Sequence, residues 1–316
     1  MEHAYPTSVY YSHNNSQGYC NMTLWNNLDL FYIFDFASIP SQNNSSDFSK
    51  LIVDIESVLY VTRLIIICMG FPLTILAIYA FYSLVRHDHV APIYVINLLI
   101  SDLIQLCCMV IWVTKIKAQQ LNNITCFVYI FSLLTSVGFM VCVALERYLV
   151  ISQPLWYRFK RTIRVSVVVC IIIWKLSLVA ILFISLASSF MYSVVLFSVF
   201  LLLPFPVLVF SLVGTLRSLF VSISVPLKEK RRIVGVLVLV LLNYTLLFLP
   251  IIILSFCRRY HSVLHALSFT LIQFSPLVNL VLYVFMRKGT IEHLSCLRGW
   301  KRNNRSSVDS RLSLGR

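Results

Sequence analysis

Glu146, Arg147 and Tyr148 stand together where a long uncharged run ends and a basic segment begins. Pro154 follows seven residues after the arginine. An arginine side chain stays charged in proteins, and its fork of donors matches a carboxylate. A permanent cation beside a carboxylate at the end of an apolar run favours a conformational switch over a transport path.

A second ionisable side chain, Asp102, lies inside another apolar run, after Asn97 and Ser101. A charge at the centre of a bilayer costs on the order of 3 kcal/mol on insertion scales, so we expect Asp102 to face protein and to have partners. Ser136 and Asn279 could face it and form a polar pocket able to hold a sodium ion and water. The alternative is a hydrogen-bonded packing site between helices that holds no ion.

The sequence has no group of side chains that would catalyse a reaction. An enzyme needs a convergent nucleophile, base or metal set, and no His-Glu-x-x-His or comparable cluster occurs. A transporter is expected to have internal repeats and several buried charges along a path, and no repeat is visible. We therefore expect neither an enzyme nor a transporter, and no cofactor beyond the sodium ion.

The composition is that of a membrane protein. Of the 316 residues, 59% are hydrophobic and 12% charged, and the mean hydropathy is +0.84. Soluble domains carry about twice that share of charge. A bilayer core needs about 20 apolar residues in a helix, and the sequence predicts an all-α bundle of seven such spans, at 58–84, 91–113, 124–151, 165–187, 190–220, 233–257 and 263–286. The fourth and fifth spans are separated at Ala187-Ser188-Ser189.

Basic residues set the predicted orientation. Most of the 26 lysine and arginine residues fall on one side of the predicted membrane, which makes that side cytoplasmic. The net charge of +14 follows from this bias and from attraction to anionic lipids, so we expect membrane lipids and no nucleic acid as partners. The predicted divisions are an outer glycosylated tail at 1–57, the bundle at 58–286, and a cytoplasmic amphipathic helix and tail at 287–316.

Several positions are candidates for covalent modification. Asn-x-Ser/Thr triplets on the outer side predict glycosylation in the tail and in the first outer loop, at Asn14, Asn21, Asn43, Asn44 and Asn123. Asn243 also matches the triplet, but we exclude it because it lies in the sixth span. Cys296, in the amphipathic segment after the last span, is a candidate for palmitoylation.

An ordered series of motifs runs from the second predicted span to the seventh. Its members are Asn97-x-x-x-Ser101-Asp102, Glu146-Arg147-Tyr148, Pro154, Trp174, Pro204, Phe248-x-Pro250 and Asn279-x-x-x-Tyr283. This series resembles the rhodopsin-like (class A) G-protein-coupled receptors. The segment Gly70-Phe71-Pro72-Leu73-Thr74 is similar to the branch that contains nucleotide, protease-activated, lysophospholipid and proton-sensing receptors.

The resemblance implies a plasma-membrane receptor that passes a ligand signal to heterotrimeric G proteins when the sixth helix swings outward. Arg147 would contact the G protein, and the apolar side chain of Leu155 would dock on it. Phe248 would pack beneath the ligand and respond to its binding. The residues implied in coupling are Glu146, Arg147, Tyr148, Pro154, Leu155 and Tyr283. The residues implied in the switch and ion pocket are Asp102, Ser136, Phe248, Pro250 and Asn279.

The sequence departs from the family pattern at several positions. Thr74 replaces an asparagine of the first span, and Leu280 replaces the proline after Asn279. The cysteine that anchors the outer disulfide of the family is replaced by Asn122. These departures motivate an alternative, a non-signalling or decoy receptor that retains the fold.

Three cysteines can lie on the oxidising outer side of the membrane. They are Cys20, Cys126 and Cys257. One prediction is a bridge between Cys20 and Cys257, which would tie the tail over the bundle. The other is that Cys126 is a buried thiol in the third span, since free cysteine is among the most buried residue types.

The ligand class stays open at this stage. Tyr129 stands where amine receptors of the family have an aspartate, and Gln273 stands where opsins keep the retinal lysine, so the resemblance does not imply either ligand. Both residues are still candidate ligand contacts, because they occupy positions that bind ligand in those relatives. Arg63, Arg258 and Arg259 on the outer side could meet an anionic lipid, nucleotide or carboxylate. Alternatively these charges only reach toward headgroups. A peptide ligand and proton sensing by the outer histidines His13, His261 and His265 are further alternatives.

Lys175 follows Trp174 in the middle of the fourth span. A cation buried at that depth is expected to have a partner or a water-filled cavity.

Overall fold

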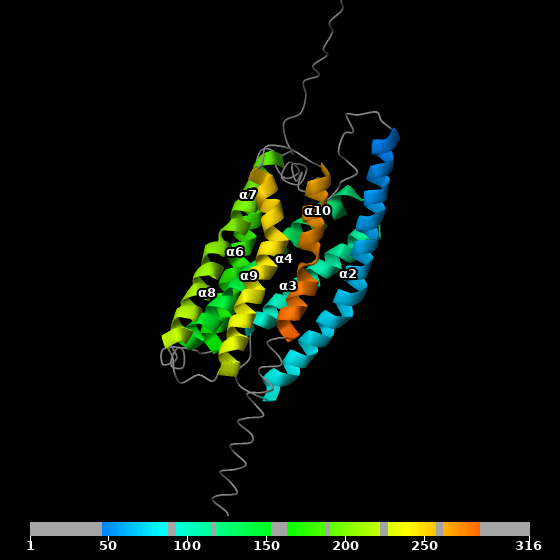
Figure 1. The fold of residues 1–316 in the computed structure, drawn as a ribbon. Coiled ribbons are helices and arrows are strands. Elements are labelled where there is room, and N and C mark those ends of the chain that lie inside the picture. The colour runs from blue at the N-terminus through cyan, green and yellow to red at the C-terminus, as the bar shows by residue number, and fades with distance from the viewer. Residues whose placement is uncertain are drawn as a thin grey trace, which may run out of the picture.

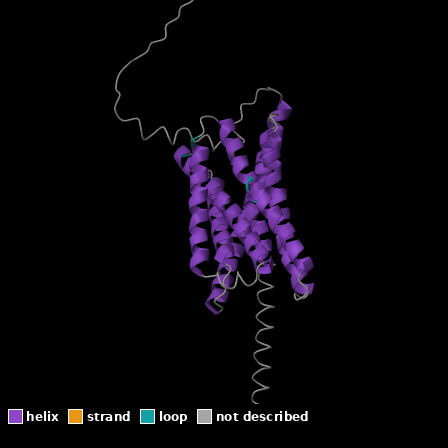
Figure 2. Ribbon diagram, turned by 90° about the vertical axis from the view of Figure 1, so that its left-hand side faces the viewer, coloured by secondary structure: helices purple, strands orange, loops and turns teal. Residues whose placement is uncertain are grey.

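The protein is a bundle of long helices that run roughly side by side (Figure 1). This computed structural model describes residues 46–87, 93–114, 118–152, 163–186, 190–221, 227–256 and 262–284. These residues form helices and short turns, without a strand among them (Figure 2). The helices are α2 (Ser46–His87), α3 (Ile93–Val113), α4 (Gln119–Ser152), α6 (Ile163–Ser185), α7 (Phe190–Leu202), α8 (Pro204–Val221), α9 (Leu227–Phe256) and α10 (Ser262–Gln273), and residues 275–284 continue the last span.

Seven segments are long and apolar enough to cross a membrane. They are Ser57–Ala80, Ile93–Val113, Gln120–Ser152, Arg164–Ser185, Tyr192–Leu219, Ile233–Phe256 and Leu267–Val284. Helices suit this setting because every backbone polar group in hydrocarbon needs a partner within the segment. The predicted all-α bundle of seven spans is confirmed. The helix α6 ends at Ser185 and α7 begins at Phe190, on either side of the predicted division at Ala187-Ser188-Ser189, which lies outside the described residues.

Proline interrupts the fifth and seventh spans. The fifth is split between α7 and α8 at Pro204, because proline lacks the N–H that would continue the helical ladder and its ring clashes with the preceding turn. The seventh turns at Phe274, whose N–H donates to the carbonyl oxygen of Leu271 at 3.1 Å, and Pro276 follows in the next turn. The sequence predicted both spans as continuous.

The first helix is longer than its predicted span. The span was predicted to begin at residue 58, after an outer tail, but α2 is already helical from Ser46 and continues to His87. Its apolar part, Ser57–Ala80, agrees with the prediction. The boundary between tail and bundle at residue 57 therefore lies within a continuous helix.

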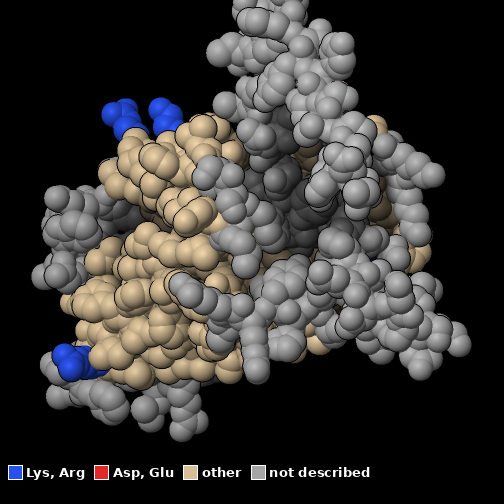
Figure 3. Space-filling model, turned by 90° about the horizontal axis from the view of Figure 1, so that it is seen from above, with Lys and Arg blue, Asp and Glu red and all other residues tan. Residues whose placement is uncertain are grey.

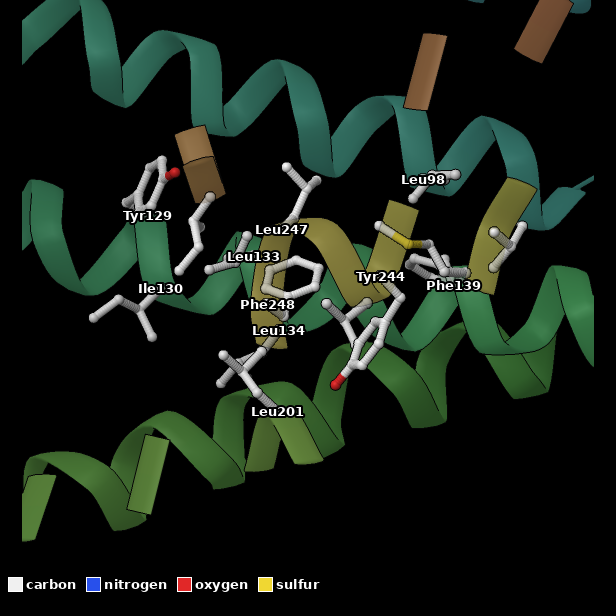
Figure 4. Close-up of a cluster of buried hydrophobic side chains, with 14 of the residues drawn as sticks. Leu98, Tyr129, Ile130, Leu133, Leu134, Phe139, Leu201, Tyr244, Leu247 and Phe248 are labelled. Carbon is white, nitrogen blue, oxygen red and sulfur yellow. The ribbon is translucent and has the colours of Figure 1, made fainter. Parts of the chain in front are cut away.

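The third span is the most enclosed part of the bundle. In α4, 72% of the apolar window is buried, compared with 22% in the first span. Its side chains pack against α9, as Figure 4 shows for Leu133 and Phe248. A helix buried on nearly all sides can position polar groups toward several neighbours at once.

Lys175 does not lie where the sequence predicted. Its side chain is exposed on the outside of α6, while Cys170, Ser177 and Ile181 on the opposite side of this helix are buried. The prediction of a buried cation is wrong because the helical period turns the bundle-facing stripe of α6 away from Lys175. In the view from above, the basic side chains that are drawn stand at the rim of the bundle (Figure 3).

Candidate functional site

Asp102 is fully buried in α3 and is surrounded by hydrogen-bond donors. The hydroxyl of Ser136 in α4 donates to Oδ1 of Asp102 at 3.0 Å. The amide nitrogen of Asn279, in the seventh span, lies 3.0 Å from both carboxylate oxygens. The structure thus brings together the three polar residues that the sequence singled out for one pocket.

The cluster is larger than predicted and extends to the sixth span. Asn243 of α9 donates through Nδ2 to Oδ1 of Asn279 at 3.1 Å. Gln105 of α3 donates to Oδ1 of Asp102 at a longer 3.4 Å. We call Asp102, Gln105, Ser136, Asn243 and Asn279 the polar network. It links the second, third, sixth and seventh spans.

Two network oxygens are available to a cation. Oε1 of Gln105 and Oδ1 of Asn243 are buried, and neither has a hydrogen-bond partner. Hard cations prefer carboxylate, carbonyl and water oxygens. The oxygens around Asp102 are of the type that a sodium ion accepts, and the sodium site and the packing-only site both stay predictions.

The predicted switch residue Phe248 is fully buried in α9. Its ring centroid lies 5.1 Å from that of Tyr244, and the Tyr244 ring lies 6.2 Å from Phe205 of α8. Figure 4 shows Phe248 among side chains of α4 and α9. Pro250 lies inside α9 just beyond it, where the missing N–H weakens the helical ladder.

The predicted coupling motif lies near the end of α4. Glu146 is buried, and Nε of Arg147 is buried without a hydrogen-bond partner. The Tyr148 ring packs edge-on against Phe210 of α8, with centroids 5.5 Å apart. Tyr283 is buried in the seventh span, while Pro154 and Leu155 lie outside the described residues.

Tyr94 and Ser166 form a second contact beside this motif. Tyr94 of α3 lies near Ser166 of α6, and it is close enough to Glu146 for an electrostatic interaction. The sequence gave no indication of this pair, because neither residue is ionised or part of a motif.

A chain of contacts joins three of the five predicted ligand residues. Nε of Arg63 in α2 donates to Oε1 of Gln273 in α10 at 3.1 Å. The Arg63 guanidinium also lies over the ring of Trp112, 5.7 Å from its centroid, a distance typical of a cation–π interaction. Trp112 in turn packs on Tyr129 with ring centroids 4.9 Å apart. Trp112 was not predicted as part of this site. The sequence signal for it is a tryptophan near the end of a span, because its N–H needs a polar partner when the ring is buried.

Trp174 and Asn97, both part of the motif series, hold the fourth span against the second. Nε1 of Trp174 donates to Oδ1 of Asn97 at 3.1 Å, and Asn97 donates to the backbone carbonyl of Ile93 at 3.0 Å. The Trp174 ring also contacts Phe131 and Phe139 of α4. These contacts position the helices that carry Asp102 and Ser136.

The remaining predictions concern the outer side and the tails. Cys126 is fully buried in α4, the position that one of the two alternatives predicted. Asn123 is in the first turns of α4, so its predicted placement in a loop is wrong, because α4 begins before the purely apolar run. The predicted positions that lie outside the described residues are Asn14, Cys20, Asn21, Asn43, Asn44, Cys257, Arg258, Arg259 and Cys296.

Known proteins are similar in sequence to parts of this chain. Residues 73–191 match the family described as 7 transmembrane receptor (rhodopsin family). Together with the seven apolar helices, this match makes the chain similar to the rhodopsin-like seven-transmembrane receptors, the family that the motif series resembles. This is a class of receptors rather than enzymes, and the chain is a multi-pass protein of the plasma membrane.

Individual relatives cover different shares of the chain. G-protein coupled receptor 68 of Mus musculus is 29% identical over 124 residues, which are 37% of this chain and 33% of that receptor. Chemokine XC receptor 1 of Homo sapiens is 25% identical over 238 residues, 70% of this chain and 69% of that receptor. Type-1 angiotensin II receptor of Oryctolagus cuniculus is 31% identical over 109 residues, 32% of this chain and 30% of that receptor. The chain thus spans about a third of the length of two of these three relatives.

Proposed function

We propose that the chain carries the signal of an extracellular ligand to heterotrimeric G proteins through an outward movement of α9. The observation that carries this proposal is the 3.1 Å hydrogen bond from Asn243 to Asn279. It ties the sixth span to the amide that holds both oxygens of Asp102. An outward movement of α9 has to break or rearrange this bond, so the polar network opposes activation.

Phe248 is the element that would transmit ligand binding to this network. It follows Asn243 on α9 and packs against Tyr244, which in turn contacts Phe205 of α8. A ligand that displaces Phe248 would disturb the packing of these three aromatic rings. Because packed cores change between discrete arrangements, such a displacement favours a shift of the whole helix.

A sodium ion would stabilise the resting arrangement. It would bring a positive charge to the buried Asp102 carboxylate, and Gln105, Ser136 and Asn243 offer it neutral oxygens. The buried carboxylate is costly without compensation. The residues that hold the ion are the same residues that join the spans, so loss of the ion and movement of α9 would favour each other.

Arg147 is the proposed contact to the G protein. Its Nε is buried without a hydrogen-bond partner, so a carbonyl or carboxylate of a docked partner would find an unused donor. Glu146 and Tyr148 flank Arg147 on α4, and Tyr283 comes from the seventh span. Pro154 and Leu155, which lie outside the described residues, would complete the proposed surface.

The ligand proposed for the outer half carries an anionic group. Arg63 is held between Gln273 and the face of Trp112, which orients its guanidinium fork for a carboxylate or phosphate. A peptide with a free carboxylate would satisfy this chemistry as well as a lipid or nucleotide, and two relatives are named for a chemokine and for angiotensin II. Arg258 and Arg259 would add charge at the same rim, and proton sensing would need the outer histidines instead.

The test is a G-protein dissociation assay with the full-length chain at matched surface expression. We expect Arg147→Ala to lower both basal and ligand-driven signal to the level of untransfected cells. Arg164→Ala is the matched control, because Arg164 is an exposed arginine at the start of α6 and its loss is expected to leave the signal unchanged. Equal signals from wild type and Arg147→Ala would contradict the proposal.

A non-signalling receptor is the second candidate. The observation that favours it is Thr74, whose buried hydroxyl has no hydrogen-bond partner, at a position where the family resemblance implies an asparagine. The first span is then not tied to the polar network through this side chain. This candidate predicts ligand binding and uptake with no G-protein dissociation, and with no effect of Arg147→Ala.

A further inference from the structure

Lys175 is a charged side chain on the lipid-facing side of a membrane span. It is exposed in the segment Arg164–Ser185 and makes no hydrogen bond or ion pair with any described residue. Only 28% of the apolar window of this span is buried inside the bundle. The charge therefore faces whatever surrounds the protein in the bilayer.

The depth of Lys175 makes this position unfavourable in lipid. A helix rises about 1.5 Å per residue, so Lys175 lies roughly 15 Å from either end of the span. Lysine can extend along its stem toward headgroups when it lies near a helix end, but this distance exceeds the reach of a four-carbon stem. A lysine at the centre of a span costs about 3 kcal/mol on insertion scales.

The surroundings of Lys175 form a continuous apolar face on α6. Its neighbours at helical spacing are exposed by roughly half of their surface: Val168 53%, Ile171 49%, Ile172 54%, Leu176 60%, Val179 46% and Phe183 59%. We call these residues and Lys175 the Lys175 face. Large aliphatic side chains around a single charge match another helix that presents an apolar surface with one opposite charge.

A second copy of this chain cannot supply that charge from its described spans. Their acidic residues are Asp102 and Glu146, and both are buried inside the bundle. Two Lys175 faces would also bring like charges together in hydrocarbon. Anionic headgroups lie at the membrane surface rather than at its centre.

We propose that the Lys175 face is the docking surface for a transmembrane helix of another protein that carries an aspartate or glutamate at mid-membrane depth. The carboxylate pairs with the Lys175 ammonium, and the flanking aliphatic residues pack around the pair and exclude lipid. The inference rests on the fold and on the position of one charge. It holds whether or not the chain couples to G proteins.

The experiment measures association in phosphatidylcholine nanodiscs between the labelled full-length protein and a synthetic leucine helix of about 20 residues with one central aspartate. Energy transfer between the two labels reports binding. We expect the aspartate helix to bind about tenfold more tightly than an all-leucine helix, the order of magnitude of a polar contact between membrane helices. Lys175→Leu should remove this difference, and its lipid-facing position makes normal folding the expectation, to be checked by thermal unfolding.

Exchanging the two charges between the protein and the helix controls for folding and specificity. Lys175→Asp should not bind the aspartate helix and should bind a leucine helix with a central lysine. The proposal is overturned if the aspartate helix binds wild type and Lys175→Leu equally, or if the exchange restores nothing. A second outcome also overturns the proposal. In it, the aspartate helix does not bind, and spin-labelled stearate is immobilised by wild type but not by Lys175→Leu. The group that pairs with Lys175 is then a lipid carboxylate.

Discussion

Asn279 carries more of the polar network than any other single side chain. Its amide nitrogen serves both oxygens of Asp102 and lies 3.2 Å from the Ser136 hydroxyl, and its oxygen accepts from Asn243. One amide therefore satisfies a buried carboxylate and connects the seventh span to three others. An amide side chain offers two donors and an acceptor without carrying a charge.

Asn279→Ala is expected to destabilise the protein by about 1 to 3 kcal/mol, because Asp102 loses its main donor while remaining buried. The measurement is the apparent free energy of unfolding in detergent micelles. Thr74→Val is the matched control, since the Thr74 hydroxyl is buried without a partner and its removal should be neutral or stabilising. A loss of equal size in both variants would contradict the assignment of the network.

Arg63→Ala is expected to reduce the potency of an anionic agonist by about ten- to a hundredfold, the value of a hydrogen bond to a charged group. Lysophosphatidate, a nucleotide triphosphate and acidified buffer are the probes, read by G-protein dissociation. Arg63→Lys keeps the charge and loses the planar fork held by Gln273 and Trp112, so an intermediate loss is expected. If wild type, Arg63→Ala and Arg63→Lys respond equally to an anionic probe, Arg63 is not part of the binding site of that probe.

The sequence was sufficient to predict Asp102, Ser136 and Asn279 as one site, because a carboxylate in a bilayer must find polar partners. It was not sufficient to predict Asn243, whose only visible signal in the sequence is a glycosylation triplet. Whether an amide in an apolar span faces lipid or protein depends on helix rotation, and one residue does not define that rotation. The same rotation explains why Lys175 was wrongly predicted to be buried.

At the scale of helices, close packing depends on the absence of side chains. Gly214 of α8 lies directly against Tyr148 of α4: a Cβ at this position would come within 2.5 Å of the Tyr148 ring. Gly138 of α4 meets Ile173 of α6 in the same way, with 2.8 Å to its Cγ2. Small residues of this kind let membrane helices approach one another closely.

Gly214→Ala is therefore expected to destabilise the protein by about 1 to 3 kcal/mol, since the rigid Tyr148 ring has to leave its contact with Phe210. The measurement is again unfolding in micelles. Gly235→Ala in α9 is the control, because nothing lies within 4 Å of the added Cβ, and its better helix propensity makes it neutral or stabilising.

A double-mutant cycle isolates this contact. In a Tyr148→Ala background the effect of Gly214→Ala should nearly vanish, because the residue that it would displace is absent. If Gly214→Ala lowers the free energy of unfolding equally in that background, the glycine is needed for its backbone conformation and not for the contact with Tyr148.

The spans were predictable as elements, but their interruptions were only partly so. Hydropathy located all seven spans, since a run of about 20 apolar residues with few charges is typical of a helix that crosses a bilayer. Pro204 and Pro276 were visible in the sequence, yet Pro72 and Pro250 lie inside continuous helices. Whether proline breaks a membrane helix depends on whether neighbours satisfy the freed carbonyl, which is a tertiary property.

At the scale of the whole molecule, the spans fall into an enclosed centre and a lipid-facing periphery. The third span is enclosed and carries Tyr129, Ser136 and Arg147 at successive depths, so one helix connects the outer aromatic contacts, the polar network and the coupling motif. The first and fourth spans are mostly exposed to lipid. We propose that the enclosed spans transmit the signal and that the lipid-facing spans contact partners.

The central claim is that the polar network restrains α9 and that its release exposes Arg147 to the G protein. The most direct measurement is ligand-independent G-protein dissociation for Asn243→Ala at matched surface expression. Loss of the Asn243 to Asn279 bond should raise the basal signal by about threefold or more, and adding Arg147→Ala should return it to background. Thr245→Ala, whose hydroxyl bonds only within α9, should behave as wild type. A basal signal of Asn243→Ala equal to that of wild type, or a raised signal that survives Arg147→Ala, would contradict the claim.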